Sequence, residues 1–159
     1  MSFLDAVNAC FRKYFRLRGR ARRAEYWYFY LFFALVSIAS SFVDVLFFDA
    51  VEDDGPIALA TSLLLLIPYI TVTVRRLHDT GRPGYYILTP LVFGAAAFGL
   101  VLLSNNYGNA LSILGFVIMA VGVILPFVWL IQSSQPGENR YGPNPIDFPR
   151  EENLSEVFQ

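Results

Sequence analysis

Four long apolar stretches constrain the fold of this chain more than any other feature of its sequence. Each contains 18 to 23 residues. A helix rises about 1.5 Å per residue and a hydrocarbon core is about 30 Å thick, so each stretch is long enough to cross a membrane. Asp44 is the only charged residue within them, whereas soluble helices carry a polar face. The sequence therefore predicts an all-α polytopic membrane protein, a bundle of four transmembrane helices. The predicted spans are residues 26–48, 57–74, 85–103 and 111–131.

The distribution of basic residues predicts which side of the membrane each loop faces. If four helices cross with both termini on one side, that side receives all twelve Lys and Arg residues. The two loops on the other side, 49–56 and 104–110, receive none. Because cytoplasmic loops carry an excess of Lys and Arg, we predict a multi-pass protein with both termini in the cytoplasm. Residues 1–150 form a single membrane domain in this interpretation, and residues 151–159 form an acidic, mobile tail.

The N-terminal residues 2–15 have the pattern of a short amphipathic helix. Ser2 can cap its start, with Asp5 at the third helical position. Apolar residues recur on one face at helical spacing. We expect a helix lying in the membrane interface, and a helix packed under the bundle is the equal alternative.

A basic run, RLRGRARR at residues 16–23, leads into the first span. Tyr26 and Trp27 follow it, and such aromatic rings settle at the level of the lipid headgroups. Each arginine near an anionic membrane surface contributes about 1 kcal/mol of attraction. The run therefore predicts anionic membrane lipids as partners, and its place beside a span argues against nucleic acid.

The acidic residues on the opposite side of the membrane provide weaker evidence about function. Asp44 lies about 27 Å along a helix from Tyr26, so we expect it to reach water on the outer side. A functional carboxylate inside the membrane is the alternative. The four carboxylates of loop 49–56 match no cation-binding motif, and we predict a solvated turn there. Neither a metal site nor a cofactor is predicted.

The segment between the second and third spans, RRLHDTGRPG at residues 75–84, concentrates charge between two apolar stretches. We expect the second helix to continue through Arg75 and Arg76 and to stop near Gly81. The sequence predicts that Glu25 and Asp79 contact arginines at this boundary.

A weaker pattern is an internal echo, LIPYI at 66–70 and ILPFV at 124–128, which is typical of two helical hairpins related by a repeat.

Three segments carry a resemblance to a known family: GRARRAEYW at 19–27, IPYITVTVRRLHDTG at 67–81 and GENRYGPNP at 137–145. They resemble the signature segments of the bacterial family called domain of unknown function 805, which consists of small inner-membrane proteins. The resemblance covers nearly the whole chain. Pro83 and Tyr85 depart from the family's usual Ser and Trp. It implies the fold and an inner-membrane location, but no reaction.

The three segments share the predicted cytoplasmic side, where their polar residues can form one network. A purely structural role is one interpretation, in which the arginines satisfy the last carbonyls of the second span. The other is a ligand site. The residues of this candidate network are Gly19, Arg20, Arg22, Glu25, Arg75, Arg76, His78, Asp79 and Arg140.

Function follows from the sequence only as a choice among classes. We favour a non-enzymatic membrane module whose basic cytoplasmic face binds anionic lipid headgroups or a protein partner. A membrane enzyme acting on a phosphate-bearing lipid is the first alternative, with His78 and Asp79 as acid and base, but no nucleophile stands beside them and no catalytic residue is assigned. A small oligomeric transporter or channel is the second, although the spans offer no polar path at their midplane. The sequence leaves open the substrate, any homo-oligomer and the physiological role.

Overall fold

The computed structural model describes residues 1–48, 55–107 and 109–146, with the backbone alone at 105–107. This part of the chain contains four helices long and apolar enough to cross a membrane, so the predicted all-α membrane fold is confirmed. The elements are α1 (Phe3–Arg12), α2 (Arg23–Phe48), α3 (Pro56–Asp79), the short 3₁₀ helix η1 (Gly84–Leu88), α4 (Thr89–Tyr107) and α5 (Ala110–Ile131). The predicted outer loop at 49–54 and the acidic tail at 151–159 lie outside the described residues.

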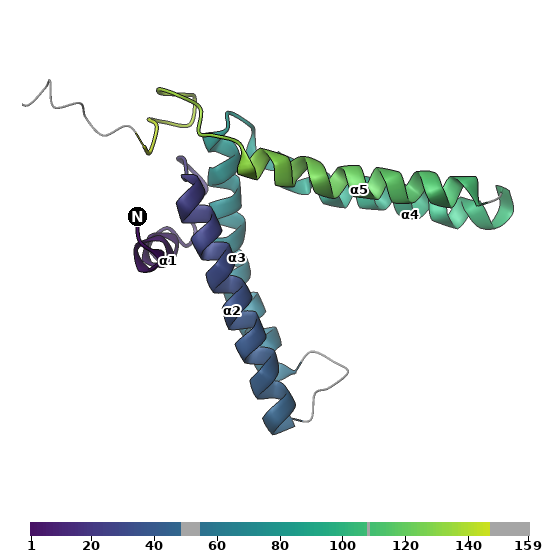
Figure 1. The fold of residues 1–159 in the computed structure, drawn as a ribbon, viewed down its shortest axis with the longest axis horizontal. Coiled ribbons are helices and arrows are strands. Elements are labelled where there is room, and N and C mark those ends of the chain that lie inside the picture. The colour runs from purple at the N-terminus through teal and green to yellow at the C-terminus, as the bar shows by residue number, and fades with distance from the viewer. Residues whose placement is uncertain (49–54, 108, 147–159) are drawn as a thin grey trace, which may run out of the picture.

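The four long helices pair into two hairpins (Figure 1). α2 packs against α3, and α4 packs against α5. The hairpins meet where α3 and α5 end and α2 begins, and they diverge away from that junction. We call this junction the basic end, because the described basic residues gather in the segments that form it. The division into two hairpins matches the internal echo in the sequence.

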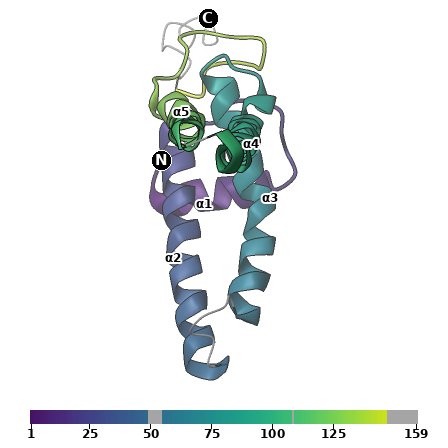
Figure 2. The same ribbon diagram turned by 90° about the vertical axis from the view of Figure 1, so that its right-hand side faces the viewer.

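Helix α1 lies across the first hairpin (Figure 2). Its start carries the predicted capping box, in which the Ser2 hydroxyl accepts from the Asp5 amide and the Asp5 carboxylate accepts from the Ser2 amide. On its inner face, Ala6, Val7 and Cys10 are buried. Phe11 beside them packs edge-on against Phe29 and Phe32 of α2. The structure thus gives α1 a packed inner face, as in the second alternative, while Leu4, on the same side of the helix as Phe11, is exposed.

Tyr14, just after α1, supports α3 at its internal proline. Pro68 has no N–H, so the carbonyl of Leu64 one turn earlier loses its helical partner. The Tyr14 hydroxyl donates a hydrogen bond to that carbonyl. Because hydrocarbon offers no other donor, this contact fixes the α1 connection against the middle of α3.

Asp44 corrects one sequence-based expectation. Its side chain is only 1% exposed, so the prediction that it reaches outer water is wrong. Its carboxylate accepts hydrogen bonds from the amides of Ile57, at 3.1 Å, and Ala58, at 2.6 Å. These amides belong to the first turn of α3, where N–H groups lack helical partners and a negative charge is favoured. Asp44 therefore caps α3 from the neighbouring helix.

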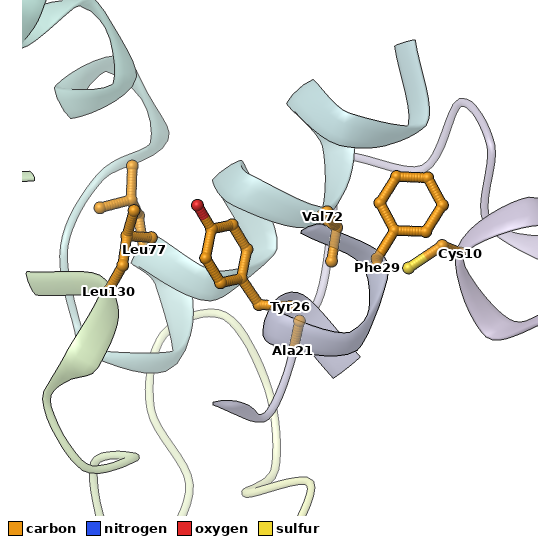
Figure 3. Packing of buried hydrophobic residues seen from close by; sticks show 7 residues of the cluster. All are labelled: Cys10, Ala21, Tyr26, Phe29, Val72, Leu77 and Leu130. Carbon is orange, nitrogen blue, oxygen red and sulfur yellow. The ribbon is translucent and has the colours of Figure 1, made fainter. Parts of the chain in front are cut away.

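A small apolar core lies directly beneath the basic end (Figure 3). It combines residues of α1, α2, α3 and α5 with one residue of the connection before α2. Its buried members are Cys10, Ala21, Tyr26, Phe29, Val72, Leu77 and Leu130. This core joins the two hairpins at their shared end, and the polar residues described next are packed against it.

Candidate functional site

The last turns of α3 are buried although they carry several charges. Arg75 is 1% exposed, and Arg76 and Asp79 are 0% exposed. An unpaired charge is costly to bury, so each of these groups needs partners. The partners come from the connection before α2, the first turn of α2, the end of α5 and the segment that follows α5. Together these ion pairs and hydrogen bonds form a polar network centred on Asp79.

Asp79 is the acceptor at the centre of this polar network. One carboxylate oxygen accepts from Arg20 Nε at 2.9 Å. The other accepts from Arg76 and from the hydroxyl of Ser134. Both arginine side chains in these pairs are at most 1% exposed. One buried carboxylate thus connects α3 to the segment before α2 through Arg20 and to the segment after α5 through Ser134.

Arg76 links the two hairpins through the end of α5. Its Nε donates to the carbonyl of Leu130 at 3.0 Å, and a terminal nitrogen donates to the carbonyl of Gln132. The last carbonyls of a helix have no partner within the helix, so Arg76 supplies what α5 lacks. The structural interpretation from the sequence expected arginines at the last carbonyls of the second span. Arg20 reaches one of them, the carbonyl of Asp79, at 3.5 Å, whereas the carbonyls that Arg76 meets belong to the fourth span.

Arg20 holds the segment after α5 against α3. Its Nη1 donates to the carbonyl of Gly137 at 2.7 Å and to that of Gly142 at 3.3 Å. Its Nη2 donates to the carbonyl of Gln135. The amide of Gln135 in turn donates to the Asp79 carbonyl at 2.9 Å. A segment without regular secondary structure is therefore fixed by one buried guanidinium.

Arg75 makes a separate ion pair with Glu25. Glu25 also accepts a longer contact, at 3.5 Å, from Lys13. Together with the Asp79 pairs, this confirms the predicted contacts of Glu25 and Asp79 with arginines. Within the described part of the chain, Nε and Nη2 of Arg75 are buried and have no hydrogen-bond partner.

Below Arg75, Cys10 forms part of the apolar core and is 0% exposed. Burial, followed by the negative charge of Glu25, raises the pKa of its thiol to about 12. A thiol with so high a pKa stays protonated and unreactive at neutral pH. Cys10 therefore belongs to the packing beneath the site and offers no nucleophile to it.

His78 is engaged by neighbours on both sides. Its Nδ1 lies 3.2 Å from the carbonyl of Gly19, and its ring stacks on Tyr141 at 3.8 Å with 4° between the planes. The side-chain amide of Asn139 donates to the His78 carbonyl at 3.0 Å. His78 is thus placed to hold the chain segments together.

Two predicted network residues lie at its margin. Arg140 is exposed, reaches the Gly81 carbonyl at 3.5 Å and lies over the Tyr141 ring. Arg22 makes no ion pair within the described residues and lines a different cavity, beside Arg23. Seven of the nine predicted residues are therefore in the network or in direct contact with it, Arg140 touches its edge, and Arg22 is separate.

Four polar partners in the segment after α5 were not selected from the sequence. They are Ser134, Gln135, Asn139 and Tyr141. Asn139 and Tyr141 lie inside the GENRYGPNP segment, which was the available signal for them. Ser134 and Gln135 precede it and carried none.

A cavity of about 260 Å³ opens beside the network, between the connection before α2 and the segment after α5. We call it the basic cavity. Five basic side chains line it: Lys13, Arg16, Arg18, Arg20 and Arg75. The rest of its wall comes from Gly19 and residues 141–145. Among the described residues no carboxylate lines it, so this part of the wall offers hydrogen-bond donors and positive charge to an anion.

The model of the family described as protein of unknown function (DUF805) matches residues 14–143. The chain belongs to the DUF805 family. The match includes every ion pair of the polar network except the contact made by Lys13. The DUF805 fold in this chain is thus built around the site described above.

Two curated relatives agree with a location in the membrane. The chain is 29% identical over 143 residues to inner membrane protein YhaH of Escherichia coli (strain K12), covering 89% of this chain and 97% of YhaH. It is 33% identical over 109 residues to inner membrane protein YhaI of the same strain, covering 62% of this chain and 87% of YhaI. No solved structure gives a significant match. With its four apolar helices, this DUF805 protein is a multi-pass inner-membrane protein.

Proposed function

We propose that this protein is a non-enzymatic module of the inner membrane that binds anionic lipid headgroups through its basic end. The basic end faces the cytoplasm in this proposal, because Lys and Arg are enriched on that side. The cytoplasmic leaflet also carries the anionic lipids that attract basic segments. Reporter fusions after Arg82 should then read as internal, and fusions after Asn106 as external.

The observation that carries the proposal is the alternation of exposed apolar and basic residues just before α2. Phe15 is 78% exposed and Leu17 is 49% exposed, and Arg16 and Arg18 between and after them are also exposed. Apolar side chains enter the boundary between headgroups and acyl chains, while adjacent arginines meet lipid phosphates. This pattern is expected for a segment that lies on an anionic membrane surface.

The division of the arginines into two groups supports the same function. Arg20, Arg75 and Arg76 are buried and hold the fold through Glu25 and Asp79. The exposed arginines have no carboxylate within ion-pair distance among the described residues. Their positive charge is therefore available to attract anionic groups outside the protein, such as lipid headgroups.

The test is the lipid that stays bound to the purified protein, measured by native mass spectrometry after mild detergent extraction. A variant with Arg12, Arg16, Arg18 and Arg23 changed to Gln should retain several-fold less acidic lipid, since each basic residue contributes about 1 kcal/mol near an anionic surface. The matched control changes the same four positions to Lys, which keeps the charge and should retain wild-type selectivity. Equal acidic-lipid retention in the Gln variant and the wild type would refute the proposal.

A further inference from the structure

We infer that the basic cavity binds a single phosphate group, with the unpaired edge of the Arg75 guanidinium as its innermost contact. The inference rests on the proposed function and gives it a defined site. It concerns a phosphate group whether it belongs to a lipid headgroup or to free phosphate, and the experiment below separates these two sources.

The first observation is that two buried donors of Arg75 are unpaired in the described structure. Its Nη1 is used by Glu25, while Nε and Nη2 are buried without a partner in the described structure. These two nitrogens form one edge of the planar guanidinium, and their N–H bonds point in nearly the same direction. This edge binds two oxygens of a phosphate or carboxylate side by side. In the described structure these two buried N–H groups of Arg75 have no acceptor.

The second observation is that Arg75 lines the basic cavity together with four other basic residues. The two carboxylates of the network, Glu25 and Asp79, are not among the lining residues. Asp79 pairs with Arg20 and Glu25 pairs with Arg75, so these carboxylates neutralise part of the positive charge from outside the cavity wall. The cavity itself therefore keeps an excess of positive charge, and at its two buried members, Arg20 and Arg75, electrostatic attraction is stronger than in open water.

The third observation is that the wall of the cavity is held in place by the fold. Arg20 fixes the segment after α5 through the carbonyls of Gly137 and Gly142, and Tyr141 is fixed by stacking on His78. The cavity volume of about 260 Å³ exceeds several times the volume of about 30 Å³ that a water molecule occupies in the liquid. The volume is sufficient for a phosphate group to lie among the buried Arg75 and the exposed Arg16 and Arg18, which line the same cavity.

A phosphate group fits these contacts better than a carboxylate does. Its oxygens can accept from the Arg75 fork and also from Arg16 or Arg18, which line the same cavity. A carboxylate has two oxygens, and the fork alone would use both. An anion that contacts both the Arg75 fork and a second arginine needs more than two oxygens, so these contacts favour a tetrahedral anion.

The experiment compares two pairs of substitutions that remove the same charge from the same basic run. Arg16→Gln with Arg18→Gln changes the cavity wall, whereas Arg22→Gln with Arg23→Gln changes arginines outside it. Arg75→Lys keeps the positive charge and removes the fork. The full-length protein is titrated with inorganic phosphate in phosphatidylcholine nanodiscs, with chloride at equal ionic strength as reference, and with phosphatidylglycerol followed by native mass spectrometry.

The inference predicts one saturable phosphate-bearing ligand per chain. Affinity should fall about tenfold in Arg16→Gln/Arg18→Gln and in Arg75→Lys, and less than twofold in Arg22→Gln/Arg23→Gln. Binding of inorganic phosphate identifies the free ion as sufficient, and binding of phosphatidylglycerol alone identifies the lipid headgroup. Should Arg75→Lys fail to fold, the two matched pairs still decide the question.

Two results would overturn the inference, and they differ in what they leave standing. Equal losses in the two matched pairs would show attraction to the whole surface without a site, and the proposed function would survive. No saturable binding and no acidic-lipid preference in the wild type would remove both.

Discussion

Replacing Asp79 by Ala should destabilise the protein more than any other removal of a carboxylate in the described structure. Asp79 is 0% exposed and accepts from two arginine side chains that are also buried. Removing one partner of a buried ion pair costs about 3–5 kcal/mol, because a charge is left without compensation. Here two arginines and the Ser134 hydroxyl lose the same acceptor, so we expect the upper part of that range.

The loss can be measured as the free energy of unfolding in dodecyl maltoside with increasing sodium dodecyl sulfate. Intrinsic fluorescence is a suitable signal, since the two tryptophans of the chain, Trp27 and Trp129, both lie near the junction of the hairpins. Glu138→Ala is the control, because Glu138 is exposed and surface substitutions usually change stability by less than about 0.5 kcal/mol.

Asp79→Asn provides a second comparison, since it keeps one acceptor oxygen and removes the charge. Its loss should lie between those of the control and Asp79→Ala. A loss below about 1 kcal/mol for Asp79→Ala would be typical of a solvated surface pair. That result would refute the conclusion that the network is dry.

Two further predictions concern residues outside the network. Tyr14→Phe should destabilise the protein by about 1–3 kcal/mol, the cost of leaving the carbonyl of Leu64 without a donor in the hydrocarbon. In a Pro68→Ala background the amide of residue 68 replaces the hydroxyl, and a penalty unchanged there would show that the hydroxyl does not act through this carbonyl. Cys10 should resist maleimide at pH 8 in the folded protein, because its pKa of about 12 leaves almost no thiolate, and should react fully after denaturation; fast labelling of the folded protein would contradict its burial.

Sequence alone predicted the four spans and the ion pairs of Glu25 and Asp79. These follow from local rules, because apolar length, helical spacing and the cost of burying charge are visible along the chain. Arg76 shows where such rules end. Its need for acceptors was predictable, but the carbonyls that it finds belong to residues more than fifty positions later. Only the contact between the hairpins decides which helix end it meets.

Asp44 and Arg22 illustrate two other limits. Asp44 lies on the same helix as Tyr26, but the direction of its side chain was not predicted, and that direction decides whether a carboxylate meets water or the unpaired amides of α3. Arg22 alternates with Arg20 in one basic run, yet Arg20 is buried and Arg22 is not. Nothing in the composition of that run distinguishes the two.

The contacts of Arg76 and Asp79 also impose an order on biosynthesis. Both residues are synthesised with α3, whereas Leu130, Gln132 and Ser134 follow about 50 residues later. At about 5–20 residues per second, that interval lasts about 3–10 s. During this time the first hairpin can already enter the membrane, but the charged end of α3 must be solvated by water or headgroups. A nascent chain that stops before the end of α5 therefore exposes part of a charged α3 terminus that the complete chain conceals.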